Sequence, residues 1–167
     1  GEDLGAMEAA FNEGGQITAG NSSQLSDGAA AVLVSSREAA EANGWPVLAT
    51  ILDYCTSGVE PARVMAAPIP AIETLLGRNG LTMDDLAYVE HNEAFAAASC
   101  AIAKTCNIPD EKLNPHGGAV AIGHPLGATG ARCLMALINA LRRTGGGKGI
   151  VTLCLGGGNA VAMLIEA

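Results

Sequence analysis

Three polar residues in this sequence have side chains and surroundings suited to acid–base chemistry. His124 lies between glycines at 123 and 127; glycine lets the backbone approach a ligand closely, and an imidazole acts as a general base near neutral pH. Cys154 ends an apolar run shortly before three glycines, where exposed N–H groups can lower a thiol pKa and hold an oxyanion. Asn92 precedes an alanine-rich stretch, and its amide can orient a water or a carbonyl oxygen.

Each of these residues also has a purely structural interpretation. His124 is then a satisfied histidine on a turn, Cys154 a buried strand cysteine, and Asn92 the cap of the alanine-rich helix that follows it. The glycine settings favour the chemical interpretation of His124 and Cys154. Asn92 is able to fill both roles, because they use different atoms.

No nucleotide or metal site is expected. The segment 145–149 lacks the P-loop spacing, and the glycines at 156–158 lead into a strand rather than a helix. The three histidines lack the i, i+4 spacing of a zinc protease, and the sequence has no Cys-x-x-Cys pair.

The bulk composition indicates a globular domain. Of the 167 residues, 49% are hydrophobic and 16% are charged. The net charge of −8 argues against nucleic acid and anionic membranes as partners, and no apolar run is long enough to span a membrane. Five cysteines without a paired motif favour a reducing compartment, so a cytoplasmic location is expected.

Hydrophobic periodicity and turn residues predict an alternation of strands and helices. Helices are expected at 37–43, 68–78, 93–106 and 127–143, and strands at 47–54, 85–91, 150–155 and 159–165, the last two as a hairpin. The apolar run 29–34 is either a buried strand or the start of a helix, and 117–123 is expected to be an irregular loop. Residues 1–16 are interpreted as a tail or linker. The fold class is therefore mixed α/β.

The three segments that carry the polar residues, together with 18–31 (Thr-Ala-Gly-Asn-Ser-Ser-Gln-Leu-Ser-Asp-Gly-Ala-Ala-Ala), resemble the C-terminal half of the thiolase family in the same order. The resemblance implies one half of a thiolase-type fold, a mixed sheet with helices on both faces, with 17–167 as the thiolase C-terminal domain. The activity it implies is that of a CoA-dependent acyltransferase, which catalyses reversible Claisen condensation and thiolysis of 3-ketoacyl-CoA.

The resemblance also implies a role for each candidate residue. His124 matches the histidine that activates the acyl-accepting thiol and helps to bind the thioester oxygen. Cys154 matches the cysteine that moves a proton to and from the α-carbon of the acetyl group. Asn92, acting through a water, and the backbone N–H of Gly156 match the donors of the two oxyanion holes.

Substrate contacts are implied in the same way. Ser23 matches a serine that contacts the pantetheine arm of CoA, and Phe95 lies in the matching wall of the acyl pocket. The family takes its coenzyme A thioester as a substrate, so neither a tightly bound cofactor nor a metal is expected. Met65 and Ala67 stand where the family usually has glycines, which bears on the shape of the pocket. His91 stands at a usually apolar position, and one interpretation is that it points to the opposite face of its strand.

In the thiolase family, an N-terminal half of similar fold supplies the acyl-carrying cysteine. The resemblance of this chain is to the C-terminal half, so the chain is expected to be inactive alone and to need an N-terminal half, in the same or a separate chain. The expected partners are acetyl-CoA or another acyl-CoA and a second copy in a homo-oligomer, and the apolar surface that packs on the other half is expected to be exposed. Two alternatives stay open: a non-catalytic half-thiolase that serves as an interaction module, and a ketoacyl-synthase-like condensing enzyme.

Overall fold

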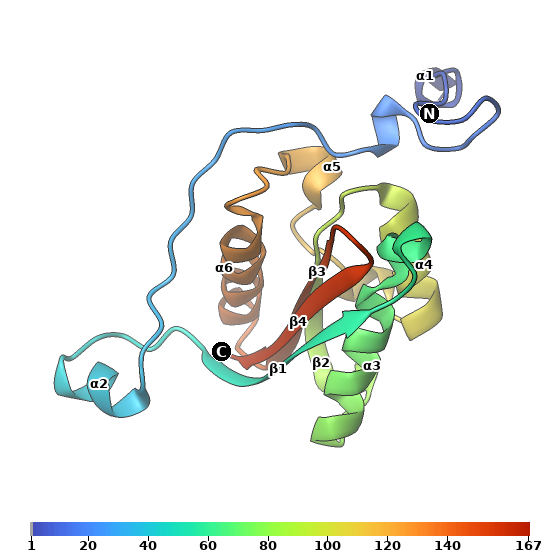
Figure 1. Ribbon diagram of the computed structural model, residues 1–167. Coiled ribbons are helices and arrows are strands. Elements are labelled where there is room, and N and C mark those ends of the chain that lie inside the picture. Colours follow the sequence, from blue (N-terminus) through green and yellow to red (C-terminus); the bar gives the residue numbers. More distant parts are fainter. Residues whose placement is uncertain (1) are drawn as a thin grey trace.

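A four-stranded mixed sheet lies at the centre of the structure (Figure 1). The computed structural model describes residues 2–167, so only the first residue of the predicted tail lies outside it. The strand order is β1-β4-β3-β2; β2 and β3 are parallel, and the other two pairs are antiparallel. The strands are β1 (Thr50–Gly58), β2 (Leu86–His91), β3 (Lys148–Leu155) and β4 (Asn159–Glu166). This arrangement confirms the mixed α/β class.

The predicted hairpin is formed by β3 and β4. Its turn contains Gly157 and Gly158, with φ of +83° and +93°, a backbone region that side chains with a Cβ rarely adopt. The chain packs tightly there, since a Cβ on Gly158 would meet the carbonyl oxygen of Val59. Gly157 and Gly158 are therefore required by the turn.

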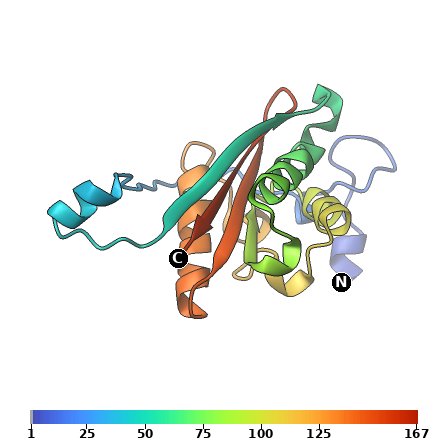
Figure 2. The same cartoon turned by 90° about the horizontal axis from the view of Figure 1, so that it is seen from below.

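Helices cover both faces of the sheet, as predicted (Figure 2). On one face, α3 (Pro68–Asn79) and α4 (Ala96–Cys106) pack on the sheet, and on the other face α6 (Thr129–Arg143) packs on β2 and β3. The larger core is aliphatic and includes Ile72, Leu75, Val89, Ile102, Ile150 and Leu164. The smaller core, under α6, includes Leu137, Leu141, Val151 and Ile165.

Two of the predicted elements begin later in the structure than the sequence indicated, and the end of a third agrees with the prediction. The first strand was predicted to begin at 47 but begins at Thr50, where Glu166 of β4 pairs with it. α3 ends as predicted, because Gly80 takes a left-handed conformation with φ of +61°. The predicted helix at 93–106 begins only at Ala96.

The remaining elements are short. They are α1 (Glu2–Gly5), α2 (Arg37–Ala42), α5 (Ala119–Ile122), and the 3₁₀ turns η1 (Ala19–Asn21), η2 (Pro61–Ala66), η3 (Met83–Asp85) and η4 (Asp110–Lys112). The expectation of an irregular loop at 117–123 was wrong in part, because α5 forms one helical turn within it. The helix predicted at 37–43 is α2, which Ser36 caps through the N–H of Ala39.

The apolar run 29–34 is neither a strand nor a helix, which corrects the prediction. It is extended, and Leu33 and Val34 are 74% and 67% exposed. A strand forms only where another backbone offers hydrogen bonds, and no strand of the described chain pairs with this run. Figure 1 shows the segment and α2 set apart from the sheet.

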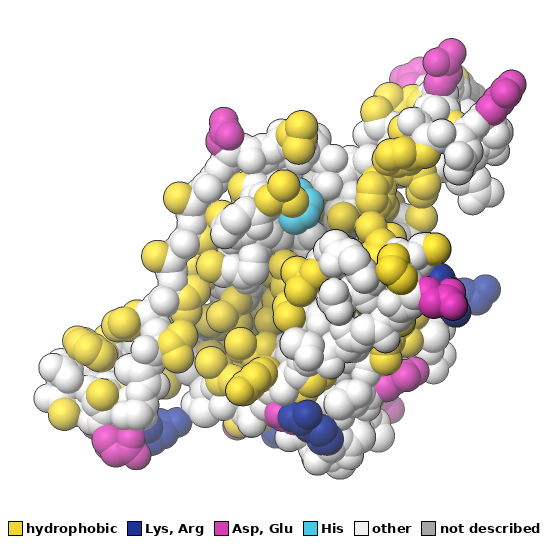
Figure 3. Space-filling view, in the orientation of Figure 1, with side chains coloured by type: hydrophobic (Ala, Val, Ile, Leu, Met, Phe, Trp, Pro, Cys, Tyr) yellow, Lys and Arg dark blue, Asp and Glu magenta, His cyan; other side chains and the backbone are white. Residues whose placement is uncertain are grey.

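Apolar side chains are exposed over this part of the molecule, as predicted. Figure 3 shows them gathered in the hollow between the extended segment and the body. Large exposed apolar residues of the region include Leu33, Val34, Trp45, Leu48, Leu52 and Tyr54. Within residues 2–167, none of the helices has the length and hydrophobicity required to cross a membrane.

Candidate active site

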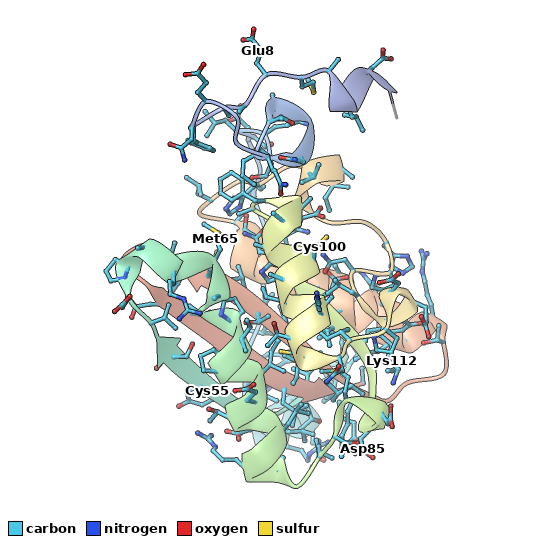
Figure 4. All side chains as sticks on the ribbon, turned by 90° about the vertical axis from the view of Figure 1, so that its right-hand side faces the viewer. Glu8, Cys55, Met65, Asp85, Cys100 and Lys112 are labelled. Atoms are coloured by element: carbon cyan, nitrogen blue, oxygen red, sulfur yellow. The ribbon has the colours of Figure 1, made fainter. Side chains whose placement is uncertain are left out.

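The candidate residues gather at the carboxyl ends of the two parallel strands. Asn92 directly follows β2, and its N–H donates to the carbonyl of Thr152 on β3 at 3.0 Å. Cys154 lies two residues further along β3. Figure 4 shows Met65, a neighbour of Cys154, at this end of the sheet and Asp85 at the opposite end. In α/β proteins ligands bind at the carboxyl ends of parallel strands.

His124 lies between α5 and α6 and is held by its backbone. Its N–H donates to the Oγ of Ser26 at 3.3 Å, across 98 residues of sequence. Gly123 precedes it with φ of +93° and ψ of 165°, a region almost restricted to glycine. A Cβ on Gly123 would collide with the Ser26 hydroxyl. The glycine is therefore needed to bring the imidazole to its position.

The end of β2 also anchors the segment that carries the imidazole. Glu93 accepts a hydrogen bond from the N–H of Val120 at 3.1 Å, in the single turn of α5. Gly118 leaves room for this carboxylate, because an added Cβ would overlap the Glu93 side chain. Asn92 and His124 are thus fixed relative to each other through neighbouring residues.

Hydrogen bonds determine which nitrogen of His124 carries the proton. The hydroxyl of Thr129 donates to the carbonyl of Pro125 at 2.9 Å and lies 2.7 Å from Nδ1 of His124. A hydroxyl has one hydrogen, so Thr129 accepts from Nδ1–H. The lone pair of the neutral ring is then on Nε2, which lies 3.3 Å from Nδ2 of Asn92.

Arg132 fixes the orientation of the Asn92 amide. Its Nη2 donates to Oδ1 of Asn92 at 3.3 Å, and since a guanidinium only donates, the amide nitrogen faces His124. Burial, with a smaller contribution from the Arg132 charge, lowers the pKa of His124. The imidazole is therefore in its neutral, proton-accepting form at neutral pH.

Cys154 lies against Met65, with 3.9 Å between the two sulfur atoms. Burial raises the pKa of the Cys154 thiol, whereas the glycine setting had predicted a lowered one; desolvation of the thiolate outweighs the nearby N–H groups. The thiol is therefore protonated at neutral pH. The structure brings His124 and Asn92 into direct contact and places Cys154 at the end of the neighbouring strand.

An apolar pocket of about 580 Å³ lies beside this group. Phe95 and Met65 line it, and Phe95 packs edge to face on Phe11 with 5.9 Å between ring centroids. The predicted acyl-wall residue is thus on a pocket wall, and the segment predicted as a tail contributes Phe11 to the same pocket. The other lining residues include Ile17, Ala98 and Ala101.

Ser23 and Gly156 lie at the edge of the group. The N–H of Ser23 donates to the carbonyl of Ala94 at 2.9 Å, which ties the segment after η1 to the residues that follow Asn92. Gly156 is exposed in the hairpin turn, and within the described chain nothing beyond its neighbours would contact a Cβ there. Its backbone is accessible to a ligand. Among residues 2–167, no three His, Cys, Asp or Glu side chains are arranged to hold a metal ion.

His91 points away from the site. Its Nδ1 lies 2.9 Å from the Ser99 hydroxyl of α4, while Asn92, the next residue, faces Arg132 of α6. Burial lowers the pKa of His91 to about 4. The interpretation of His91 as a residue on the opposite face of the strand is confirmed.

Sequence reasoning missed the residues that hold the imidazole and the amide. Thr129 and Arg132 lie three residues apart near the start of α6 and therefore share one face. Their spacing, in a helix predicted to begin soon after His124, could have indicated that both residues face the site. Ser26 and Glu93 gave no such signal, since their contacts depend on segments distant in the sequence.

Gly123→Ala is expected to destabilise the protein by about 1–3 kcal/mol, because alanine is strained at this φ and ψ and collides with Ser26. The measurement is urea denaturation of both proteins. The matched control is Gly127→Ala, where nothing lies within 4 Å of the added methyl. Equal stability of the two variants would contradict the role assigned to Gly123.

Comparison with protein-family models gives two matches. "Thiolase, C-terminal domain" matches residues 45–167, and "Thiolase, N-terminal domain" matches residues 1–38. Among curated proteins, the chain is 45% identical to an acetyl-CoA acetyltransferase of Syntrophomonas wolfei, covering 99% of the chain and 42% of the relative. It is 46% identical to the peroxisomal 3-ketoacyl-CoA thiolase B of Rattus norvegicus, covering 99% of the chain and 39% of the relative.

Solved structures give a similar result. The acetyl-CoA acetyltransferase of Bacillus anthracis superposes with a TM-score of 0.96 at 43% identity, and 99% of this chain covers 42% of that chain. Human mitochondrial 3-ketoacyl-CoA thiolase in complex with CoA superposes with a TM-score of 0.91 at 34% identity, with the same coverage. The chain therefore spans about two fifths of the length of these relatives.

Proposed function

Since this chain belongs to the thiolase family, we propose that it supplies the acid–base half of the active site of a CoA-dependent acyltransferase. The reaction is the reversible Claisen condensation of acyl-CoA and acetyl-CoA, and in reverse the thiolysis of a 3-ketoacyl-CoA. The observation that carries the proposal is the contact between Nε2 of His124 and the Asn92 amide at 3.3 Å. In this arrangement the imidazole is neutral, and the lone pair on its Nε2 faces the Asn92 amide nitrogen, a hydrogen-bond donor that is held in place.

In thiolysis, Nε2 of His124 takes the proton of the acyl-accepting thiol. The thiolate attacks C3 of the 3-ketoacyl-CoA, and the C2–C3 bond breaks with its electron pair left on C2 as an enolate. The Cys154 thiol then donates its proton to C2, and acetyl-CoA leaves while the acyl group stays on the acyl-accepting cysteine as a thioester. The raised pKa of Cys154 supports this role, because the thiol keeps its proton until the carbanion forms.

In the second half of the reaction, the Cys154 thiolate takes the proton of CoA–SH, and the CoA thiolate attacks the thioester on the acyl-accepting cysteine. That cysteine leaves as a thiolate and takes back its proton from His124, and the shortened acyl-CoA is released.

Two sets of donors stabilise the negative charge that develops on oxygen. Asn92, through a water, and His124, once its Nε2 has taken the thiol proton, serve one thioester oxygen, and the backbone N–H of Gly156 serves the other. Ser23 contacts the pantetheine arm, and Phe95 forms part of the wall of the acyl pocket. The position of Phe95 on the apolar pocket supports this assignment.

The acyl-accepting cysteine comes from an N-terminal half, in the same or a separate chain. The exposed apolar surface supports an association with such a half, because an apolar area of this kind usually marks an interface. Assembly as a homo-oligomer and a cytoplasmic location stay predictions.

Two proteins test the proposal: the 167-residue chain alone, and a chimera in which it replaces the matched segment of the Syntrophomonas wolfei relative. CoA-dependent cleavage of acetoacetyl-CoA is measured in each. We expect activity in the chimera and none in the chain alone. Activity in the chain alone would disprove the need for a second half. A chimera that folds cooperatively but is inactive would disprove the acyltransferase function and favour an interaction module.

A further inference from the structure

We infer that Arg132 is a positioning residue that keeps Asn92 and the proton-accepting nitrogen of His124 in their working arrangement, and that its charge also acts on the buried carboxyl of Glu90. The inference depends on the proposed function only in naming the reaction in which Asn92 and His124 take part. The geometry itself comes from α6 and β2, which pack against each other.

Two residues in one turn of α6 contact the side chains of His124 and Asn92. Thr129 contacts Nδ1 of His124 at 2.7 Å, and Arg132, three residues later, contacts Oδ1 of Asn92 at 3.3 Å. The amide of asparagine can turn over and present its oxygen instead of its nitrogen. With the oxygen facing Nε2, two lone pairs would face each other. The guanidinium prevents this, because it requires an acceptor on its own side.

Glu90 is a buried residue of β2 and is 1% exposed. It precedes Asn92 by two residues, so both side chains leave the strand toward α6. Within the described chain, Oε1 of Glu90 and Nε of Arg132 are both buried without a hydrogen-bond partner. A buried carboxyl is costly unless a cation compensates for it. The charge of Arg132 acts on this carboxyl, although the two form no ion pair in the described chain, and the Cys133 thiol is the other titratable group coupled to it.

The charge of Arg132 acts on both titrating neighbours. Burial raises the pKa of Glu90 to about 7, and Arg132 opposes this rise. Burial lowers the pKa of His124, and Arg132 adds to this decrease. Loss of the cation alone is therefore expected to raise both pKa values. A mere loosening of the structure would admit water, which would lower the pKa of Glu90 toward its ordinary value.

Arg132→Gln separates these two explanations. In the intact protein, ¹³C NMR titration follows Glu90 and His124, with resonances assigned from Glu90→Gln and His124→Asn. We expect both pKa values to rise in Arg132→Gln and to stay close to wild type in Arg132→Lys, which keeps the cation. Arg142→Gln, at the far end of the same helix, is the matched control. A fall in the pKa of Glu90, or no change in either group, would overturn the inference.

If Arg132→Gln does not fold, the isosteric Glu90→Gln variant tests the same coupling through the ¹⁵N resonance of the Arg132 guanidinium. We expect this resonance to move in Glu90→Gln, and an unchanged resonance would overturn the inference. The NMR readouts need no activity, so a failure of the proposed function is recognised separately. In an active protein, Arg132→Gln is also expected to move the acid limb of the rate profile to higher pH, because the base must be deprotonated to work.

Discussion

Replacing His124 with asparagine is expected to lower kcat/KM for thiolysis by about 10²- to 10⁴-fold, the contribution typical of a positioned general base. Asparagine keeps a polar side chain of similar reach but cannot take a proton at neutral pH. The backbone of residue 124 would still donate to Ser26, so the segment should keep its place. The measurement is acetoacetyl-CoA cleavage by the intact enzyme or by the chimera.

The matched control for this change is His116→Asn. His116 is exposed and lies in the turn that precedes α5, so its replacement is expected to leave kcat/KM unchanged. The pH profile adds a second check. The lowered pKa of His124 keeps the base neutral, so activity is retained down to pH values below the ordinary histidine range. A His124→Asn variant with wild-type turnover would remove His124 from the proposed mechanism.

Replacing Cys154 with alanine is expected to slow proton exchange at the α-carbon of acetyl-CoA by about 10²- to 10⁴-fold. The alanine side chain, unlike the thiol of Cys154, cannot give or take a proton. Exchange is measured as deuterium uptake from heavy water into the acetyl methyl group, followed by mass spectrometry. This readout isolates the step at carbon from transfer of the acyl group between thiols.

Cys100→Ala is the control, because Cys100 is exposed on α4 (Figure 4). It should exchange protons at the wild-type rate and show that loss of a thiol elsewhere has no effect. Unchanged exchange in Cys154→Ala would contradict the proposed role of the thiol. That result would favour the ketoacyl-synthase-like alternative, in which no cysteine is needed at position 154.

Much of the fold is predictable from short stretches of sequence. α3 ends at a glycine that adopts a left-handed conformation, and the β3–β4 hairpin turns at Gly157 and Gly158, which have positive φ. Both follow from the conformational freedom of glycine, which acts within a few residues. The run 29–34 was not predictable, since whether an apolar segment is a strand depends on a partner elsewhere.

The sequence by itself determined the chemical groups of the site, the glycines that bare the backbone around them, and the strands and helices that carry them. Only the tertiary structure decided that Asn92 meets His124 across 32 residues, that Ser26 holds His124, and that Arg132 turns the Asn92 amide. Local periodicity reflects energies between near neighbours in the chain. Contacts between distant segments depend instead on strand register and on how α6 docks, and those are properties of the whole packed core.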